Sequence, residues 1–295
     1  MEYFFHILVV IQINVILAVS LNLISGYCGL LSLAHSAFYG IGAYTAALMW
    51  QYFGIASLSL NILIGCFVSS VLSLLLTYPS IKGVHDDFFV ISTVGFQIIV
   101  FNIFNNCVSF TNGPLGISGI PFPSILTLSI DTSLKYFFFS LFFTIIIYVF
   151  VNRLVKSPFG LIIRGIREDE IFTMSAGKNI NKYKILVSII SCSVASIAGV
   201  LYGHYSSFVD PSSFTINESI FLISIIIIGG IANIKGSILG AIILIILPEL
   251  FRFVGMPISV AANLRQILYG SALVLFMMFR PHGLIGEYNF TNKTI

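Results

Sequence analysis

The sequence predicts an all-α protein that crosses a membrane several times. Of its 295 residues, 58% are hydrophobic and only 8% are charged, whereas an ordinary soluble domain carries roughly 25% charged residues. The mean hydropathy is +1.04, and no Asp, Glu, Lys or Arg lies between Tyr3 and Ile81. Because such a chain cannot cover itself with polar surface, we expect lipid to surround it, and helices then satisfy the backbone hydrogen bonds internally.

Apolar segments long enough to span the hydrocarbon core, about 20 residues, recur along the whole chain. We therefore expect roughly eight to ten transmembrane helices in a single transmembrane domain, residues 1–295. One interruption, residues 153–184, divides the helices into two unequal groups. The expected spans lie near residues 3–24, 34–52, 56–77, 88–108, 134–152, 185–208, 217–231, 236–251 and 263–280.

The positions of Lys and Arg predict which side of the membrane each loop faces. Half of the 14 Lys and Arg lie in the interruption at 153–184, and the positive-inside rule places such a loop in the cytoplasm. The loops at 109–133 and 209–216 contain neither residue type, as expected of loops outside the cell. By alternation, we expect the C-terminus in the cytoplasm.

The stretch GYCGLLSLAHSAFYGIGAY, residues 26–44, interrupts the first apolar region with glycine and polar residues. Gly26 and Gly29 permit backbone conformations that a regular helix does not use. Irregular backbone at membrane depth is tolerated only where protein buries it or where it lines a cavity. The stretch therefore predicts a glycine-broken or re-entrant helix that begins near Ser32.

Polar groups share one face of that expected helix. Ser32, His35, Ser36 and Tyr39 are spaced i, i+3, i+4 and i+7, which places them on one side. This face either hydrogen-bonds and packs against other helices or lines a translocation pathway. Gly40 extends the four-residue spacing of Ser32 and Ser36, and small residues at that spacing allow close helix approach in lipid. The same spacing recurs later in the chain, at Ala232, Gly236 and Gly240.

The interruption contains a further helix signal, within SPFGLIIRGIREDEIFTMSAGKNINKYK, residues 157–184. Pro158 ends the preceding helix, the acidic run at 168–170 favours a helix start, and Gly177 marks an end. We expect a short cytoplasmic helix at about 167–176, which is either a solvated linker or a surface for a partner. Its apolar anchor residues are Ile171, Phe172 and Met174.

Two ionisable residues, Glu249 and Arg252, are spaced i, i+3 near the end of a late apolar segment. Charged groups in such places are usually paired. We expect a structural ion pair here rather than a substrate site.

Motifs for catalysis and metal binding are absent from the sequence. It contains no GxxxxGK(S/T) phosphate loop, no HExxH pair and no GxSxG elbow, and its histidines lack the spacing of metal ligands. We therefore expect no catalytic residue, no metal and no cofactor bound by this chain. The remaining class is a transport or pore-forming subunit rather than an enzyme.

Five blocks of the chain resemble, in order, the LivM-type branched-chain amino acid permeases of bacterial ABC importers. The first block is GYCGLLSLAHSAFYGIGAYTAALM. The later ones include TNGPLGISGIP, SPFGLIIRGIREDEIFTMSAGKNINKYK, SVASIAGVLYGHYSSFVDPSSF and IIIIGGIANIKGSILGAIILIILPEL. The resemblance covers nearly the whole chain, and blocks of this length in one order are a specific signal.

The resemblance implies one subunit of a larger assembly in the bacterial plasma (inner) membrane. Such permeases pair with a LivH-type sister permease and bind two cytoplasmic ATP-binding subunits, which use the ATP. An extracytoplasmic substrate-binding protein delivers the cargo. The short helix would be the coupling helix, and cysteines placed at Glu168 or Thr173 are expected to cross-link to the ATPase. The coupling residues implied by the resemblance are Glu168, Glu170, Thr173, Ala176 and Gly177.

The implied function is the import of branched-chain, hydrophobic amino acids by alternating access, driven by ATP hydrolysis in the partner subunits. Two alternatives stay open at this point. A related importer of urea or other amides would share the architecture and differ in cargo. A stand-alone channel or secondary carrier would need no ATPase, although no expected span has the paired carboxylates of a proton-coupled carrier.

Overall fold

The computed structural model describes residues 2–81, 86–125, 128–129 and 132–252, together with residues 267, 269–271, 273–276, 278–279 and 283–285. Long helices dominate these ranges. They are α1 (Glu2–Leu21), α2 (His35–Phe53), α3 (Leu58–Ile81), α4 (Asp86–Asn106), α6 (Ser133–Lys156), α9 (Ile180–Ser206), α10 (Ile216–Gly229) and α11 (Ile234–Arg252).

Shorter elements lie at the ends of the long helices. A π-helix, η1 (Asn22–Tyr27), continues α1, and α5 (Val108–Thr111) follows α4. The strands β1 (Ile117–Ser118) and β4 (Phe208–Val209) pair antiparallel, as do β2 (Ser124–Ile125) and β3 (Leu128–Ser129). The remaining elements are two 3-10 turns, η2 (Gly113–Leu115) and η3 (Pro211–Phe214), and two helices, α7 (Pro158–Glu168) and α8 (Glu170–Ser175).

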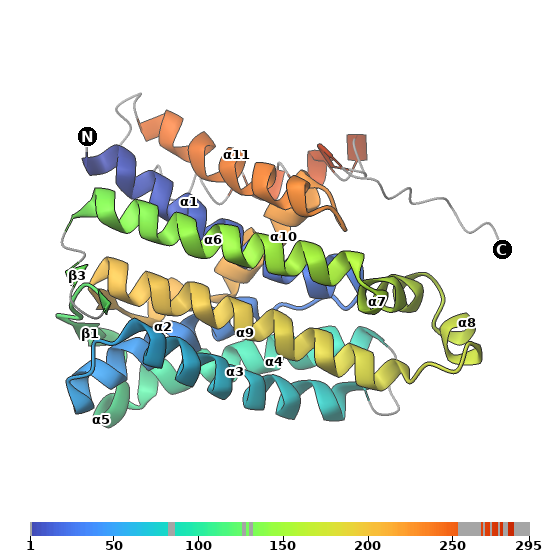
Figure 1. Ribbon diagram of the computed structural model, residues 1–295, viewed down its shortest axis with the longest axis horizontal. Helices are drawn as coiled ribbons and strands as arrows, with labels where there is room; N and C mark the ends of the chain where they lie inside the picture. Colours follow the sequence, from blue (N-terminus) through green and yellow to red (C-terminus); the bar gives the residue numbers. More distant parts are fainter. Residues whose placement is uncertain are drawn as a thin grey trace.

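The long helices run side by side in one bundle (Figure 1). The N-terminus, α5, β1 and β3 lie at one end of the bundle, which we call the strand end. Helices α7 and α8 lie at the opposite end. We call this the basic end, because it includes the Lys- and Arg-rich residues 153–184.

Five described helices are long and apolar enough to cross a membrane, and the count rises to six if one bent pair is a single span. That pair is α10 with α11, which is bent by 119° at the break between the two helices. The all-α polytopic architecture expected from the sequence is therefore confirmed. The expected span at 34–52 corresponds to α2, and the one at 263–280 is described only in part, at residues 267, 269–271, 273–276 and 278–279, which are helical. The five helices are Glu2–Tyr27, Leu58–Ile81, Phe88–Asn106, Ser133–Lys156 and Ile180–Ser206.

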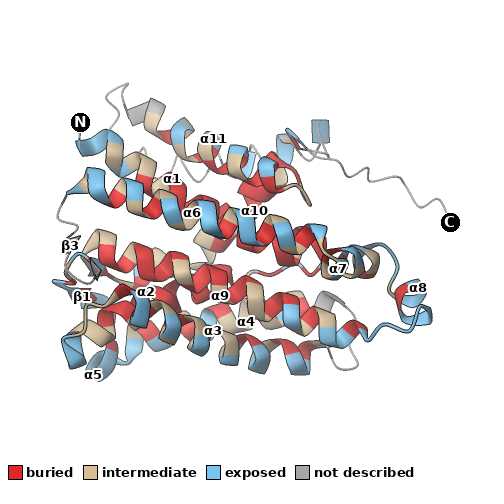
Figure 2. Ribbon diagram, in the orientation of Figure 1, coloured by how far each residue is buried: buried red, intermediate tan, exposed pale blue. Residues whose placement is uncertain are grey.

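Burial divides the helices into an inner and an outer set. Figure 2 shows buried residues concentrated along α9 and α2, whereas α3 and α6 carry many exposed residues. The exposed side chains of the outer set are largely apolar, as expected of faces that contact lipid or another membrane subunit. Examples from α3, α4 and α6 are Leu63, Phe67, Ile91, Phe138 and Phe142.

The inner contact between α2 and α9 depends on two glycines. A Cβ atom added at Gly42 would lie 2.1 Å from the carbonyl oxygen of Ser196, and one added at Gly199 would lie 2.0 Å from that of Tyr39. No side chain fits at such distances, so the two backbones touch. This is the close packing through small residues that drives helix association in lipid.

Hydroxyl groups join α9 to α3 along the next contact. The Oγ atoms of Ser73 and Ser188 lie 2.9 Å apart, and Thr77 Oγ1 lies 2.7 Å from the same Ser188 oxygen. Further along, the Oγ atoms of Ser70 and Ser193 lie 2.8 Å apart. Interhelical hydrogen bonds in membranes contribute on average about 0.6 kcal/mol each, so these bonds supplement the close packing rather than replace it.

Glycine also forms the bend between α10 and α11. A Cβ atom added at Gly229 would lie 2.1 Å from the carbonyl oxygen of Gly236, and one added at Gly240 would lie 2.2 Å from that of Ile225. The four-residue spacing of Gly236 and Gly240 therefore places both against α10. The two spans expected at 217–231 and 236–251 correspond to α10 and α11, which form this bent pair.

Candidate functional site

The first glycine-rich stretch is a break between two helices. Helix α1 continues into η1 as far as Tyr27, and α2 begins at His35. Gly29 lies between them with a φ of +84°, a left-handed conformation that favours glycine. The expected helix break is confirmed, but α2 begins three residues after Ser32, and the π-helix before the break was not expected from the sequence.

Asn22, which sequence reasoning did not single out, joins this break to the one between α10 and α11. Its Nδ2 donates to the carbonyl oxygen of Asn233 at 3.0 Å and to Ser237 Oγ at 2.6 Å. Its Oδ1 accepts from the backbone N–H of Ala232 at 2.9 Å. Gly26 leaves room for this amide, because an added Cβ atom would lie 1.7 Å from Asn22 Oδ1. A buried amide in an apolar helix is the signal that could have identified it.

His35 is buried in the centre of the bundle between α1 and α9. Its Nε2 lies 2.9 Å from Ser20 Oγ and 3.5 Å from Ser191 Oγ. Ser20 Oγ donates its proton to the Leu17 carbonyl oxygen at 2.8 Å, so the imidazole Nε2–H is the donor in the His35–Ser20 bond. His35 therefore links α2 to α1.

Ser36 and Ser32 are also enclosed by protein. Ser36 Oγ donates to the Thr215 carbonyl oxygen at 2.8 Å, and its backbone N–H donates to Ser219 Oγ at 3.2 Å. The backbone N–H of Ser32 donates to Ser25 Oγ at 3.3 Å. These bonds join the start of α2 to α10 and close the loop of the first break.

Tyr39 and Gly40 have different surroundings from Ser32, His35 and Ser36. The Tyr39 ring packs edge-on against Phe214, with centroids 5.1 Å apart, and Tyr39 also lines a pocket. A Cβ atom added at Gly40 would lie 2.8 Å from Phe104 Cε2 and 2.9 Å from Phe214 Cγ. Gly40 thus faces aromatic side chains, and the backbone contact of α2 is made at Gly42.

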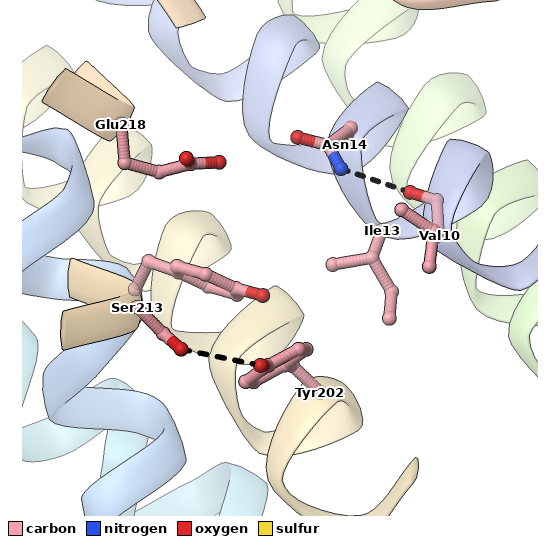
Figure 3. Close-up of a pocket in the computed structure, with 7 residues that line it drawn as sticks. Val10, Ile13, Asn14, Tyr202, Ser213 and Glu218 are labelled. Carbon is pink, nitrogen blue, oxygen red and sulfur yellow. Dashed lines mark hydrogen bonds between the residues drawn. The ribbon is translucent and has the colours of Figure 1, made fainter. Parts of the chain in front are cut away.

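The pocket beside Tyr39 has a volume of about 200 Å³ and lies between α1, α2, α9, η3 and α10. Figure 3 shows Glu218 on one side of it and Asn14 on the other, with Tyr202 and Ser213 below. Sequence reasoning missed these polar residues, although an acid in the first turn of an apolar helix, as Glu218 is, is a recognised sign of a functional position. The lining residues are Val10, Ile13, Asn14, Tyr39, Tyr202, Ser213 and Glu218.

The interruption at the basic end folds as two helices rather than one. Asp169 separates α7 from α8 and caps α8, since its carboxylate accepts from the Phe172 N–H at 2.9 Å. Pro158 occupies the first turn of α7, where its missing N–H costs nothing. The expected helix start at the acidic run is confirmed, but the expected range 167–176 overlaps the end of α7 as well as α8. Gly177 follows with a φ of +74°.

The five expected coupling residues divide into exposed and enclosed ones. Glu168, Ala176 and Gly177 are exposed, whereas Glu170 pairs with the buried Lys184 of α9 at 2.5 Å. Thr173 is only 6% exposed, because it packs against α7 and its Oγ1 donates to the Asp169 carbonyl oxygen at 2.9 Å. The cross-links expected from cysteines at Glu168 and Thr173 stay predictions, and the structure places Glu168 on the surface and the Thr173 side chain against the chain's own α7.

Glu170→Gln should lower the melting temperature of the purified protein. Lys184 would lose the carboxylate that neutralises it, and breaking a fully buried ion pair costs roughly 3–5 kcal/mol. Glu170 is 40% exposed, so water screens the pair and we expect about 1–2 kcal/mol. Glu168→Gln, which removes an exposed acid two residues away, is the control. Equal melting temperatures for the two variants would show that the pair does not stabilise the fold.

Helix α7 contacts the first helix break directly. The Arg167 guanidinium donates to the carbonyl oxygen of Gly26, and the Arg164 guanidinium lies 5.2 Å from the centroid of the Tyr27 ring. A cation over an aromatic face is attractive. The segment that carries α8 is therefore tied to the break, which Asn22 ties in turn to the α10–α11 bend.

The expected ion pair of Glu249 and Arg252 stays a prediction, because the Arg252 side chain lies outside the described residues. The Glu249 carboxylate accepts a hydrogen bond from the Tyr3 hydroxyl group. This bond joins α11 to the start of α1.

Polar groups gathered at helix breaks inside a bundle of apolar helices are typical of the class of polytopic membrane transport proteins. Comparison with known families identifies the particular family within this class. The profile of the family described as the branched-chain amino acid transport system permease component matches residues 3–278. The chain belongs to this family and is a multi-pass membrane protein.

Individual relatives agree with the family. The chain is 33% identical to the high-affinity branched-chain amino acid transport system permease protein LivM of Salmonella typhimurium and 32% identical to that of Escherichia coli K12. Each alignment covers 93% of this chain and 68% of the relative. The LivH permease protein of E. coli is 22% identical over 92% of this chain and 91% of the relative. No solved structure matches the chain.

Proposed function

We propose that this chain is the transmembrane permease subunit of an ABC importer that moves branched-chain amino acids into the cell. The family match over residues 3–278 carries the proposal, and the LivM relatives support the cargo. In this role the chain is not an enzyme and binds no cofactor, and the ATP is used by partner subunits.

The proposed partners are a LivH-type sister permease, two cytoplasmic ATP-binding subunits and an extracytoplasmic substrate-binding protein. The similarity to LivH proteins supports a related pair of permeases. The apolar side chains exposed on α8 support a docking surface for an ATPase, because such side chains on a soluble segment mark contact sites. They are Ile171, Phe172 and Met174, which are 78%, 73% and 62% exposed.

We place the protein in the bacterial plasma (inner) membrane with its basic end in the cytoplasm. The Lys and Arg of residues 153–184 support this orientation. The backbone N–H groups of Leu284 and Ile285 donate to the carbonyl oxygens of Ile228 and Gly229 at 2.9 and 3.1 Å. Ile285 also lines a pocket together with Arg164 of the basic end, which supports a cytoplasmic C-terminus.

The seven residues expected at the translocation pathway or in helix packing receive two proposed roles. Tyr39 borders the pathway, because it lines the pocket. The other six hold the helix breaks and α2 in place: Gly26, Gly29, Ser32, His35, Ser36 and Gly40. In alternating access, ATP must bind one conformation of the assembly more tightly than the other. A pathway bounded by helix breaks can then open to either side while α2 and α9 stay packed.

ATP-dependent uptake of labelled leucine tests the proposed function. Vesicles containing this chain, the sister permease, the ATPases and the binding protein should accumulate leucine, and unlabelled isoleucine and valine should compete whereas urea should not. Omitting this chain should abolish uptake. Competition by urea alone would change the cargo, and uptake that persists without this chain would remove its proposed role.

A further inference from the structure

The pocket between Asn14 and Glu218 presents hydrogen-bond acceptors. Which atoms accept follows from the hydrogen bonds in which the neighbouring N–H and O–H groups already donate. Asn14 is 8% exposed, and its Nδ2 donates to the Val10 carbonyl oxygen at 3.0 Å. A carbonyl oxygen can only accept, so this bond fixes which end of the amide faces the pocket. The Oδ1 atom of Asn14 is buried without a hydrogen-bond partner in the described part of the chain.

A second acceptor follows from the hydroxyl groups opposite. Ser213 Oγ donates its proton to Asp210 Oδ1 at 2.7 Å. The 3.4 Å contact between Tyr202 and Ser213 therefore has the Tyr202 hydroxyl group as donor. A phenol that donates keeps its own oxygen lone pair as an acceptor.

Glu218 supplies the negative charge of the pocket. It lies in the first turn of α10, where the positive end of the helix dipole stabilises an anion. Figure 3 shows its carboxylate and the Asn14 side chain on facing sides of the pocket. Among the described lining residues there is no Lys, Arg or His, so the pocket suits a cation and offers no positive charge to pair with a carboxylate.

We propose that this pocket binds the α-ammonium group of the transported amino acid within the permease. Three acceptors, on Glu218, Asn14 and Tyr202, match the three N–H donors of an ammonium group. Val10 and Ile13 provide an apolar wall for an aliphatic side chain. A volume of about 200 Å³ is below the usual range for drug-sized ligands, roughly 300–1,000 Å³, as expected for a smaller molecule. The inference rests on the proposed function and adds a substrate contact to it.

Metal binding is a less suitable use of the same pocket. No cluster of three or more His, Cys, Asp or Glu that could hold a metal occurs in the described residues. Two uncharged acceptors with a single carboxylate are a weak set for a divalent cation, whereas an ammonium group needs only one counter-charge and hydrogen bonds.

Equilibrium dialysis of labelled leucine against the complex of this chain, its sister permease and the ATPases, with the binding protein left out, tests the inference. The competitors are two halves of leucine: 3-methylbutylamine, which keeps the amine, and 4-methylpentanoate, which keeps the carboxylate. We expect the amine to displace leucine and the acid not to. Displacement by the acid alone or by both equally, or no leucine binding at millimolar concentration, would overturn the inference.

Variants locate the contact within the chain. Glu218→Gln should weaken leucine binding about tenfold to a hundredfold, as expected for the loss of a charged hydrogen bond. Asn14→Leu removes a second acceptor and should also weaken binding. Glu2→Gln removes an exposed carboxylate from the start of α1 and should bind leucine as the unaltered chain does. Melting temperatures confirm that each variant is folded, and unchanged binding in both pocket variants would refute the assignment.

ATP-dependent uptake separates this inference from the proposed function. If the unaltered assembly imports leucine and Glu218→Gln imports it equally well, the ammonium site is wrong and the importer stands. If the unaltered assembly imports no leucine, the proposed function itself fails. An import defect confined to Glu218→Gln and Asn14→Leu would support both.

Discussion

Gly42→Leu is expected to prevent formation of a stable bundle. Any Cβ atom at this position lies 2.1 Å from the carbonyl oxygen of Ser196, so α2 and α9 must separate along their length. Overpacking a core typically costs about 1–3 kcal/mol, and sometimes more, when side chains can adjust. Here the obstacle is backbone, which cannot rotate away. Because proteins have only about 5–15 kcal/mol of total stability, we expect loss of the monodisperse protein in detergent.

Two other glycines provide graded controls for this prediction. Gly95 lies in α4 and has no atom within 4 Å of an added Cβ atom, so Gly95→Leu should leave the melting temperature nearly unchanged. Gly40→Leu should have an intermediate effect, because Phe104 and Phe214 are side chains that can shift. Size-exclusion chromatography after heating measures all three variants. A Gly42→Leu protein as stable as Gly95→Leu would show that the α2–α9 contact is not required.

Phe172→Asp is expected to abolish ATP-dependent uptake while leaving the membrane bundle intact. The side chain is 73% exposed on α8, so the substitution should cost the isolated chain little. In an ATPase interface, a buried aromatic residue commonly contributes 2 kcal/mol or more, so roughly 30-fold weaker association is expected. Pull-down of the ATPase by the permease pair, together with leucine uptake, measures the effect.

Leu115→Asp is the matched control for the α8 variant. Leu115 is 81% exposed, but it lies in η2 at the strand end, away from α8. This variant should bind the ATPase normally. Equal loss of ATPase binding in both variants would point to general damage, and normal binding by Phe172→Asp would remove α8 as the docking surface.

Sequence reasoning predicted features that depend on neighbouring residues. Helical spans followed from the length of apolar segments, the first break followed from Gly26 and Gly29, and the start of α8 followed from the acids near Asp169. Each is a local property, because backbone conformation and capping act within a few residues. The class of protein and its family were therefore evident before any contact was known.

Features that depend on long-range contacts could not be predicted in this way. The four-residue spacing predicted a close helix contact at Gly40. The close backbone approach is at Gly42 instead, because Gly42 is the residue that faces α9. The pocket around Glu218 combines several segments, and no spacing in one of them indicates the others. Pro158 was correctly expected to end the helix before it, since α6 stops at Lys156. That α7 begins at Pro158 was not predicted, although proline suits the first turn of a helix.

The bonds of Asn22 also have a consequence for biosynthesis. Its side chain bonds the carbonyl group of a residue 211 positions later in the chain. A ribosome adding about 5–20 residues per second needs on the order of 10–40 s to make that stretch. A polar group in hydrocarbon without a partner is costly, so during this interval the nascent α1 requires water or other temporary partners for its amide. The α10–α11 pair, made later, completes the hydrogen bonds of a segment that was made earlier.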